Sequence, residues 1–318
     1  MSGGDMGGEM KDTARLFHVI ESQQFGRPLL DQVMAHTRTV AADPAAFGGA
    51  LASRVMATLF YEPSTRTRLS FEAAMLRLGG RVISTENARE FSSGAKGETL
   101  EDTIRVVSGY ADVIVLRHNE MAASARSAAV SSVPVINAGD GPGQHPTQAL
   151  LDLFTIEAEI GHIDGLRIAM VGDLANGRTV RSLSFLLSRY RDVQIHFVAP
   201  HLVAMKDDIK AHLEEHRVSF SETEDLNSVL PHVDVVYQTR IQKERFANPD
   251  DYDRVRSVYV IGERELGLMG DRAVLMHPLP RVDEIDPAVD GDRRAAYFRQ
   301  ARNGLYVRMA LLHMILAE

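Results

Sequence analysis

Short apolar runs recur along the chain, and between them apolar residues return every three or four positions, as at Leu69, Ala73 and Leu76. The runs predict strands over Val55–Tyr61, Arg81–Thr85, Ala111–Leu116, Val133–Asn137, Leu166–Val171, Val193–Val198, Val233–Gln238, Ser257–Ile261 and Ala273–Met276. Short apolar strands that alternate with helices indicate parallel sheets covered on both faces. Because the pattern occurs twice, we predict an α/β chain with two doubly wound parallel-sheet domains.

A helix that begins near Pro146 marks the expected boundary between these domains. Gly161 and Gly165 then separate this helix from the next predicted strand. We expect a first domain over residues 1–147 and a second over 148–301. The apolar segment Gly304–Ala317 predicts a last helix within 302–318, and we expect it to pack back on the first domain.

Composition removes several classes of protein. The chain has 318 residues, no cysteine and a net charge of −8, so disulfides, thiolate nucleophiles and cysteine-based zinc sites are excluded. The acidic balance, the lack of Trp and the 6% aromatic content disfavour a nucleic-acid binder. We expect no membrane association, because no apolar run is long enough to span a bilayer. The Gly-rich first ten residues do not resemble a signal peptide, so we expect a cytoplasmic protein.

Polar residues gather directly after the predicted strands, where open parallel sheets bind ligands. These segments are Glu62–Arg68, Arg117-His118, Gly139–Gln148, Gly172–Thr179, Thr239–Gln242 and His277–Arg281. Many of their charged residues are arginines, although the chain as a whole is acidic. The pattern predicts an anion-binding active site in the cleft between the two domains.

The segment Ser64–Arg68 gives the clearest single signal. Ser64 is a good N-cap for a helix through Leu76, and the first turn of that helix offers backbone N–H groups to an anion. Thr65 and Thr67 would add hydroxyls, and Arg66 and Arg68 would add guanidinium groups suited to phosphate. The alternative is a capped surface helix with solvated arginines. It is not a Walker loop, because the Gly-rich run and its lysine are missing.

His145 stands before Pro146, which suits the first position of a helix. An imidazole at a helix N-terminus is biased toward its neutral form, so its N–H could polarise a substrate carbonyl. The alternative is a purely structural histidine. In the loop 91–99, Lys96 is the one lysine, and the alternative for that loop is an ordinary mobile surface segment. Leu174 occupies the second glycine position of a dinucleotide loop, which disfavours a nicotinamide cofactor.

Taken together, the motifs resemble those of the carbamoyltransferase family from about Leu51 to the C-terminus. They are Ser64-Thr65-Arg66-Thr67-Arg68, Lys96-Gly97-Glu98-Thr99, Arg117-His118, His145-Pro146-Thr147-Gln148, Gly177-Arg178-Thr179, Thr239-Arg240-Ile241-Gln242 and His277-Pro278-Leu279-Pro280-Arg281. The ornithine-specific branch typically has a His-Cys-Leu-Pro segment, whereas this chain has His-Pro-Leu-Pro. Arg178 and Arg240 suit an acceptor with two carboxylates and would repel ornithine. The resemblance is therefore closest to the aspartate-specific branch.

The resemblance implies transfer of a carbamoyl group from carbamoyl phosphate to L-aspartate, a step of pyrimidine biosynthesis, without a cofactor or metal. It implies the following catalytic residues: Arg66, Thr67, Lys96, Arg117 and His145. For carbamoyl phosphate it implies a site made of Ser64, Thr65, Arg66, Thr67, Arg117, His145, Gln148, Pro278, Leu279 and Pro280. For aspartate it implies Ser92, Lys96, Arg178, Arg240 and Gln242.

In this family Ser92 and Lys96 resemble loop residues that reach into a neighbouring subunit, which implies a homotrimer with shared active sites. Regulatory chains or pathway enzymes are possible partners. Ala95, Ala175 and Asn176 depart from the family pattern and leave loop affinity and regulation open. Two alternatives stay open: a carbamoyltransferase with another amine acceptor such as ornithine, and a non-catalytic anion-binding or scaffold chain.

Overall fold

The computed structural model describes residues 16–86, 97–243, 246 and 248–317. Two parallel sheets organise it, with strand orders β2-β1-β3-β4 and β7-β6-β5-β8-β9. The strands are β1 Val55–Phe60, β2 Arg81–Glu86, β3 Val113–His118, β4 Val135–Asp140, β5 Arg167–Val171, β6 Gln194–Val198, β7 Ser219–Thr223, β8 Val235–Gln238 and β9 Val274–Met276. The prediction of two parallel-sheet α/β domains is therefore confirmed.

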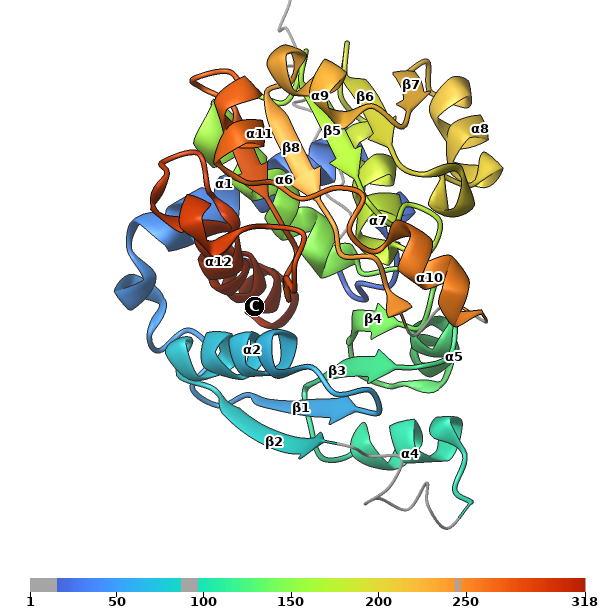
Figure 1. Cartoon of the computed structure of the whole chain (residues 1–318). Coiled ribbons are helices and arrows are strands. Elements are labelled where there is room, and N and C mark those ends of the chain that lie inside the picture. The colour runs from blue at the N-terminus through green and yellow to red at the C-terminus, as the bar shows by residue number, and fades with distance from the viewer. Residues whose placement is uncertain (1–15, 87–96, 244–245, 247, 318) are drawn as a thin grey trace, which may run out of the picture.

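Helices connect the strands and cover both sheets (Figure 1). The α-helices are α1 Arg27–Ala42, α2 Thr65–Arg77, α4 Leu100–Val107, α5 Ala123–Val130, α6 Pro146–Ile160, α7 Arg178–Leu187, α8 Asp207–Glu215, α9 Leu226–Val229, α10 Pro249–Val255, α11 Glu263–Leu268 and α12 Tyr297–Leu316. Short 3-10 helices occupy Ser22–Gln24, Pro44–Phe47, His201–Val203, Leu230–His232 and Pro287–Gly291. Among the described residues, no helix is both long and apolar enough to cross a membrane.

Most predicted strands are present, with ends displaced by at most three residues. The predicted strand over Ser257–Ile261 is wrong, because Val258 and Val260 are exposed and only Ile261 forms an isolated bridge, to Ile285. Strand β7 was not predicted. It lies at the edge of its sheet, where Phe220 is its one apolar residue, so it has no apolar run that the sequence would reveal.

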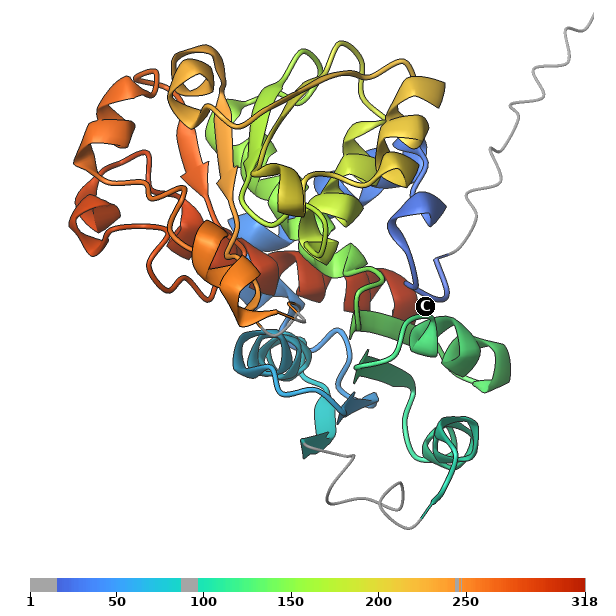
Figure 2. The same ribbon diagram turned by 45° about the vertical axis from the view of Figure 1, so that its right-hand side comes forward.

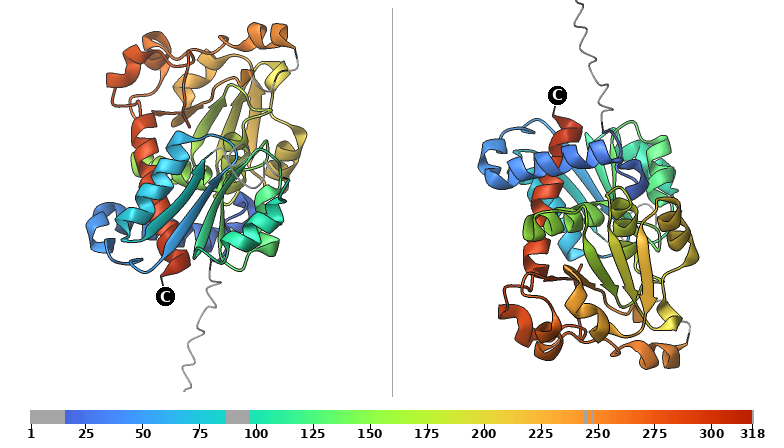
Figure 3. Two further views of the ribbon diagram at one scale, coloured as in Figure 1. Left: turned by 90° about the horizontal axis from the view of Figure 1, so that it is seen from below. Right: turned by 90° about the horizontal axis from the view of Figure 1, so that it is seen from above.

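Helices α6 and α12 lie between the two sheets and supply much of the shared core (Figures 1 and 2). Helix α12 packs against α1, α2 and α6 (Figure 3). It begins at Tyr297, earlier than the apolar segment predicted. This arrangement brings α12 close to the carboxyl ends of strands from both sheets, where the site lies.

Candidate functional site

A cavity of about 510 Å³ lies between the two sheets and gathers most of the predicted site residues. The predicted residues that line it are Ser64, Arg66, Thr67, Arg117, His145, Gln148, Arg178, Arg240, Gln242, Pro278, Leu279 and Pro280. Thr65 is exposed and does not line the cavity. Ser92 and Lys96 lie outside the described residues. Arginines that are dispersed in the sequence thus come together around one space.

The N-terminal turn of α2 forms one wall of the cavity. Ser64 is the N-cap of this helix, as predicted, and the side chains of Arg66 and Thr67 face the cavity. Partial burial lowers the pKa of Arg66 from its usual value. The expectation for Arg68 is wrong, because its guanidinium lies 2.8 Å from Glu86 on β2 and does not line the cavity. Two helical residues two positions apart point to nearly opposite sides, which explains the difference.

Arg117 and Arg178 meet above a single carboxylate. Arg117 Nη2 lies 3.2 Å from Glu62 Oε1, and Arg178 Nη1 lies 3.5 Å from Glu62 Oε2. Arg117 Nη1 also donates to the carbonyl oxygen of Ala138 at 3.2 Å, and Arg178 Nη1 donates to that of Gly141 at 2.7 Å. Burial, and then the charge of Arg178, lowers the pKa of Arg117 to about 10. Arg117 is therefore still cationic at neutral pH and favours an anionic ligand.

His145 is the N-cap residue of α6 and is only 4% exposed. Its backbone N–H donates to Ser182 Oγ at 3.1 Å, which holds the start of α6 against α7. Burial lowers the pKa of His145 well below its usual range, and the charges of Arg178, Arg117 and Arg308 act in the same direction. The imidazole is therefore neutral at physiological pH. This is the form that can donate a hydrogen bond to a substrate oxygen without releasing a proton.

The state of His145 makes a prediction about stability. Its pKa is lower in the folded protein than in the unfolded chain, so unfolding takes up a proton below about pH 6.5. Its contribution to stability is present above that pH and is lost as the pH falls toward its folded pKa. We expect His145→Gln to weaken the acid-side decline in unfolding free energy by up to about 1.4 kcal/mol per pH unit. Urea unfolding of both proteins at several pH values between 5 and 8 measures the free energy of unfolding. The same dependence of this free energy on pH in the wild type and the variant would contradict the prediction.

The turn His277–Pro280 closes another side of the cavity. The His277 N–H donates to Gln300 Oε1 at 2.8 Å, and His277 Nδ1 accepts from the Leu279 N–H at 2.8 Å. Because Nδ1 accepts, Nε2 carries the ring proton and donates to Glu284 Oε1 at 2.7 Å. Burial lowers the pKa of His277, in keeping with a neutral ring. These contacts fix the turn, and its residues Pro278, Leu279 and Pro280 line the cavity.

Gln242 lies on the wall formed by the second sheet. Its backbone N–H donates to Asp173 Oδ2 at 3.3 Å, and its side-chain amide donates to the Asn176 carbonyl oxygen at 3.3 Å. Asp173 Oδ1 also accepts from the Asn176 backbone at 3.0 Å. Asn176, one of the departures from the family pattern, thus helps to hold Gln242 in place.

Several lining residues were not predicted from the sequence. Glu62 was visible only as part of a polar segment. Gln300 lies on the part of α12 that precedes the predicted apolar segment Gly304–Ala317, and Arg308 lies within that segment. Arg308 is 3% exposed, and burial lowers its pKa to about 10. The signal that could have indicated it is an arginine within the mostly apolar segment Gly304–Ala317, since a buried charge is costly without a function or a partner.

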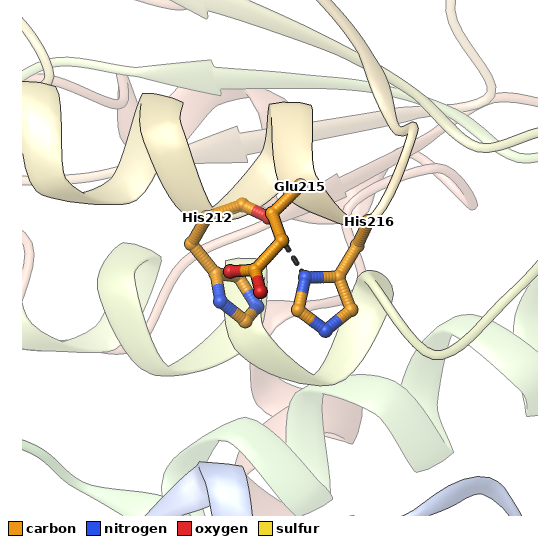
Figure 4. Close-up of side chains that lie close together, drawn as sticks. All are labelled: His212, Glu215 and His216. Atoms are coloured by element: carbon orange, nitrogen blue, oxygen red, sulfur yellow. Dashed lines mark hydrogen bonds between the residues drawn. The ribbon is translucent and has the colours of Figure 1, made fainter.

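A group of possible metal ligands lies at the C-terminal end of α8, and its members do not line this cavity: His212, Glu215 and the C-cap residue His216 (Figure 4). His216 Nδ1 bonds to the His212 carbonyl oxygen at 2.9 Å, and its Nε2 lies 3.2 Å from Arg189 Nη1. The guanidinium therefore already donates to the lone pair that a metal would need, and its charge repels a cation. We assign no metal to this group.

Comparison with known proteins decides the family. Residues 18–158 match the family model "Aspartate/ornithine carbamoyltransferase, carbamoyl-P binding domain". Residues 164–315 match the model "Aspartate/ornithine carbamoyltransferase, Asp/Orn binding domain". The chain belongs to the aspartate/ornithine carbamoyltransferase family. The resemblance drawn from the motifs is therefore confirmed.

Relatives within this carbamoyltransferase family favour its aspartate branch. Aspartate carbamoyltransferase 1 of Pisum sativum is 59% identical over 95% of this chain and 79% of its own. The catalytic subunit from Methanocaldococcus jannaschii is 52% identical over 84% of this chain and 87% of its own. The aspartate transcarbamoylase structure from Trypanosoma cruzi in complex with N-(phosphonacetyl)-L-aspartic acid has a TM-score of 0.89 and 40% identity, covering 95% of this chain and 96% of that one.

One expectation is contradicted by these carbamoyltransferases. The expected cytoplasmic location conflicts with the matching proteins from Pisum sativum, Oryza sativa and Arabidopsis thaliana, which are chloroplastic. The expectation rested on the lack of cysteine and on the composition of the first ten residues. Neither property distinguishes one reducing compartment from another, which explains the error.

Proposed function

We infer that this chain is an aspartate carbamoyltransferase, which transfers the carbamoyl group of carbamoyl phosphate to the amine of L-aspartate. The products are N-carbamoyl-L-aspartate and phosphate. The observation that carries this proposal is the convergence of Arg66, Arg117, Arg178, Arg240 and His145 on one cavity. Matched proteins from the aspartate branch support it, among them a Trypanosoma cruzi structure in complex with carbamoyl phosphate and aspartate.

We assign carbamoyl phosphate to the wall formed by α2, Arg117 and the start of α6. Backbone N–H groups of the first turn of α2, the Ser64 and Thr67 hydroxyls and Arg66 bind the phosphate. Thr65 contributes its backbone N–H, since its side chain does not line the cavity. Arg117 bridges the phosphate and the carbonyl oxygen. Gln148 and the backbone carbonyls of the turn Pro278–Pro280 bind the carbamoyl amide.

We assign aspartate to the adjoining part of the cavity, which Arg178, Arg240 and Gln242 line. Two guanidinium groups can bind the two carboxylates of aspartate, whereas the cationic side chain of ornithine would be repelled. Ser92 and Lys96 complete this site in our proposal.

In the proposed reaction, carbamoyl phosphate binds first, aspartate follows, and the neutral amine of aspartate attacks the carbamoyl carbon. Neutral His145, Arg117 and Thr67 stabilise the oxyanion that develops on the carbonyl oxygen. The C–O bond to the phosphate then breaks, Arg66 and the α2 turn stabilise the leaving phosphate, and that phosphate takes the amine proton. Catalysis comes from positioning two reactants and from preorganised charge.

A direct assay tests this function. The purified protein is given carbamoyl phosphate with aspartate, with ornithine or with no acceptor, and phosphate release and carbamoyl product are measured. We expect product with aspartate and at most trace product with ornithine. Comparable turnover with ornithine would favour the alternative acceptor, and no turnover with either would favour a non-catalytic anion-binding chain.

We propose that the catalytic unit is a homotrimer whose Ser92 and Lys96 reach into a neighbouring active site. Exposed apolar side chains on α2 and the adjoining β2, namely Leu76 and Ile83, support a subunit contact there. Light scattering should give the mass of three chains, and the mass of one chain would contradict the proposal.

Regulatory chains or pathway enzymes are possible further partners, and pull-down with the assembled trimer tests for them.

We also propose the division into substrate domains. Residues 1–147, together with the C-terminal helix within 302–318, form the carbamoyl phosphate-binding domain, and 148–301 form the aspartate-binding domain. The packing of α12 against α1 and α2 supports the assignment of that helix to the first domain.

A further inference from the structure

A fully buried carboxylate, Asp152, lies on α6 one turn beyond Gln148. Its Oδ1 accepts from Gln148 Nε2 at 2.8 Å and from Gln300 Nε2 at 2.7 Å. Its Oδ2 accepts from Tyr237 Oη at 2.6 Å. These donors come from α6, α12 and β8, so one side chain ties together three elements that surround the cavity.

The contacts of Asp152 extend to both groups that face the carbamoyl amide. Gln148 lines the cavity directly. Gln300 holds the turn at the other side, since its Oε1 accepts from the His277 N–H at 2.8 Å and its Nε2 donates to Asp152. The relative position of Gln148 and the turn His277–Pro280 therefore depends on two hydrogen bonds that share the same carboxylate oxygen.

We propose that Asp152 is a positioning residue, which sets the distance between Gln148 and the turn His277–Pro280 so that both can bind the carbamoyl amide of the donor substrate. This inference rests on the proposed function. Asp152 does not line the cavity itself and acts through Gln148 and Gln300. Nothing in the sequence signals it, because an isolated aspartate within the apolar helix α6 has no recognisable motif.

Asp152 acts in its ionised form. All three of these hydrogen bonds are donated to its carboxyl group, and a proton on Oδ1 would face the amide donors of Gln148 and Gln300, which cannot accept it. The titratable groups nearest to it are Tyr237 on β8 and Arg308 on α12, and the charge of Arg308 favours the carboxylate. Burial outweighs these contacts and raises the pKa of Asp152 to about 7. Binding of carbamoyl phosphate should therefore weaken as the pH falls through neutrality.

The test compares Asp152→Ala and Asp152→Asn with the wild type by steady-state kinetics at saturating aspartate between pH 6 and 9. We expect Asp152→Ala to lower kcat/KM for carbamoyl phosphate about tenfold, as loss of a supporting hydrogen-bond partner does in other sites. Asp152→Asn keeps an oxygen that can accept from both amide donors. We therefore expect its kcat/KM for carbamoyl phosphate to lie within about threefold of the wild-type value at pH 8. Its pH profile should lack the step near pH 7 that the wild type shows.

Controls separate this role from general stability. Asp112→Asn removes another structural carboxylate, which accepts from Arg54 and from the Val55 N–H and does not line the cavity. It should lower the melting temperature and leave the pH step in place. If Asp152→Ala does not fold, Gln300→Leu breaks the link to His277 and should raise KM for carbamoyl phosphate. If the wild type is active, either of two results overturns the inference. One is an Asp152→Asn variant that keeps the step near pH 7 in its pH profile, and the other is folded variants that bind carbamoyl phosphate as well as the wild type does. An inactive wild type instead overturns the proposed function.

Discussion

Arg66→Ala is expected to lower kcat about a hundredfold or more, the scale of losing one preorganised donor to a developing anion. Arg66 lies in the first turn of α2, where backbone N–H groups and the helix dipole already favour an anion. Its guanidinium faces the cavity and adds a full charge at the position we assign to the leaving phosphate. That charge matters most as the C–O bond breaks, so kcat should fall more than KM rises. Rapid-quench or steady-state kinetics with both substrates measures it.

The same helix offers a matched control for this experiment. Arg68→Ala removes an identical side chain two residues further on, but that guanidinium bonds to Glu86 and does not line the cavity. We expect its kcat to stay within about threefold of the wild type, because a partly exposed ion pair contributes little. Equal loss in both variants would mean that the effect comes from the fold of α2, and near-normal turnover of Arg66→Ala would refute the role of Arg66.

Most of the site residues predicted from the sequence line one cavity, although some elements of the fold were not predicted. Parallel strands align their carboxyl ends, so polar segments placed after strands converge whether or not each strand end is located correctly. Strand β3 runs on through His118, two residues past its predicted end, and yet Arg117 still lines the cavity. Strand β7 stayed unseen because an edge strand buries little, and so its sequence is not constrained to an apolar run.

What the sequence does not reveal is the layer behind the lining residues. Asp152 lies on α6, Gln300 and Arg308 lie on α12, and the contacts that join these two helices link residues far apart along the chain. Asp152 and Gln300, for example, are separated by 148 positions. Hydrogen bonds of this kind depend on how helices pack, which the pattern along one helix does not specify. The misassigned Arg68 shows the same limit at short range, where the direction of a side chain depends on helical phase.

Gly139 shows how backbone geometry supports the arginine pair. Glycine has no Cβ atom, so other groups can come close to its backbone. At Gly139 two side chains do so. A Cβ atom there would lie 2.9 Å from Arg117 Nη1 and 3.1 Å from Arg178 Cζ, and φ is +115°. The lack of a side chain therefore lets both guanidinium groups approach the strand end, where Arg117 bonds to Ala138.

We expect Gly139→Ala to lower kcat/KM for both substrates about a hundredfold. The new methyl group displaces Arg117, assigned to carbamoyl phosphate, and Arg178, assigned to aspartate, and a displacement of about 1 Å in a catalytic group costs on that order. Because both arginines move, the loss should appear with either substrate varied. If Gly139→Ala lowered kcat/KM for only one of the two substrates, the idea that both arginines are displaced would be contradicted. Steady-state kinetics with each substrate varied in turn distinguishes these outcomes.

The loss in Gly139→Ala could come from backbone strain at a positive φ and not from movement of the two arginines. A substitution at Gly161 distinguishes these causes. Gly161 ends α6 with a φ of +90°, and a Cβ atom there would meet nothing within 4 Å. Gly161→Ala thus imposes the cost of a left-handed alanine, about 1 kcal/mol of unfolding free energy, without moving a guanidinium. We expect it to lower the melting temperature and to leave kcat/KM unchanged. If Gly161→Ala lost activity as Gly139→Ala does, backbone strain rather than the arginine pair would explain both, and the role of Gly139 would fall.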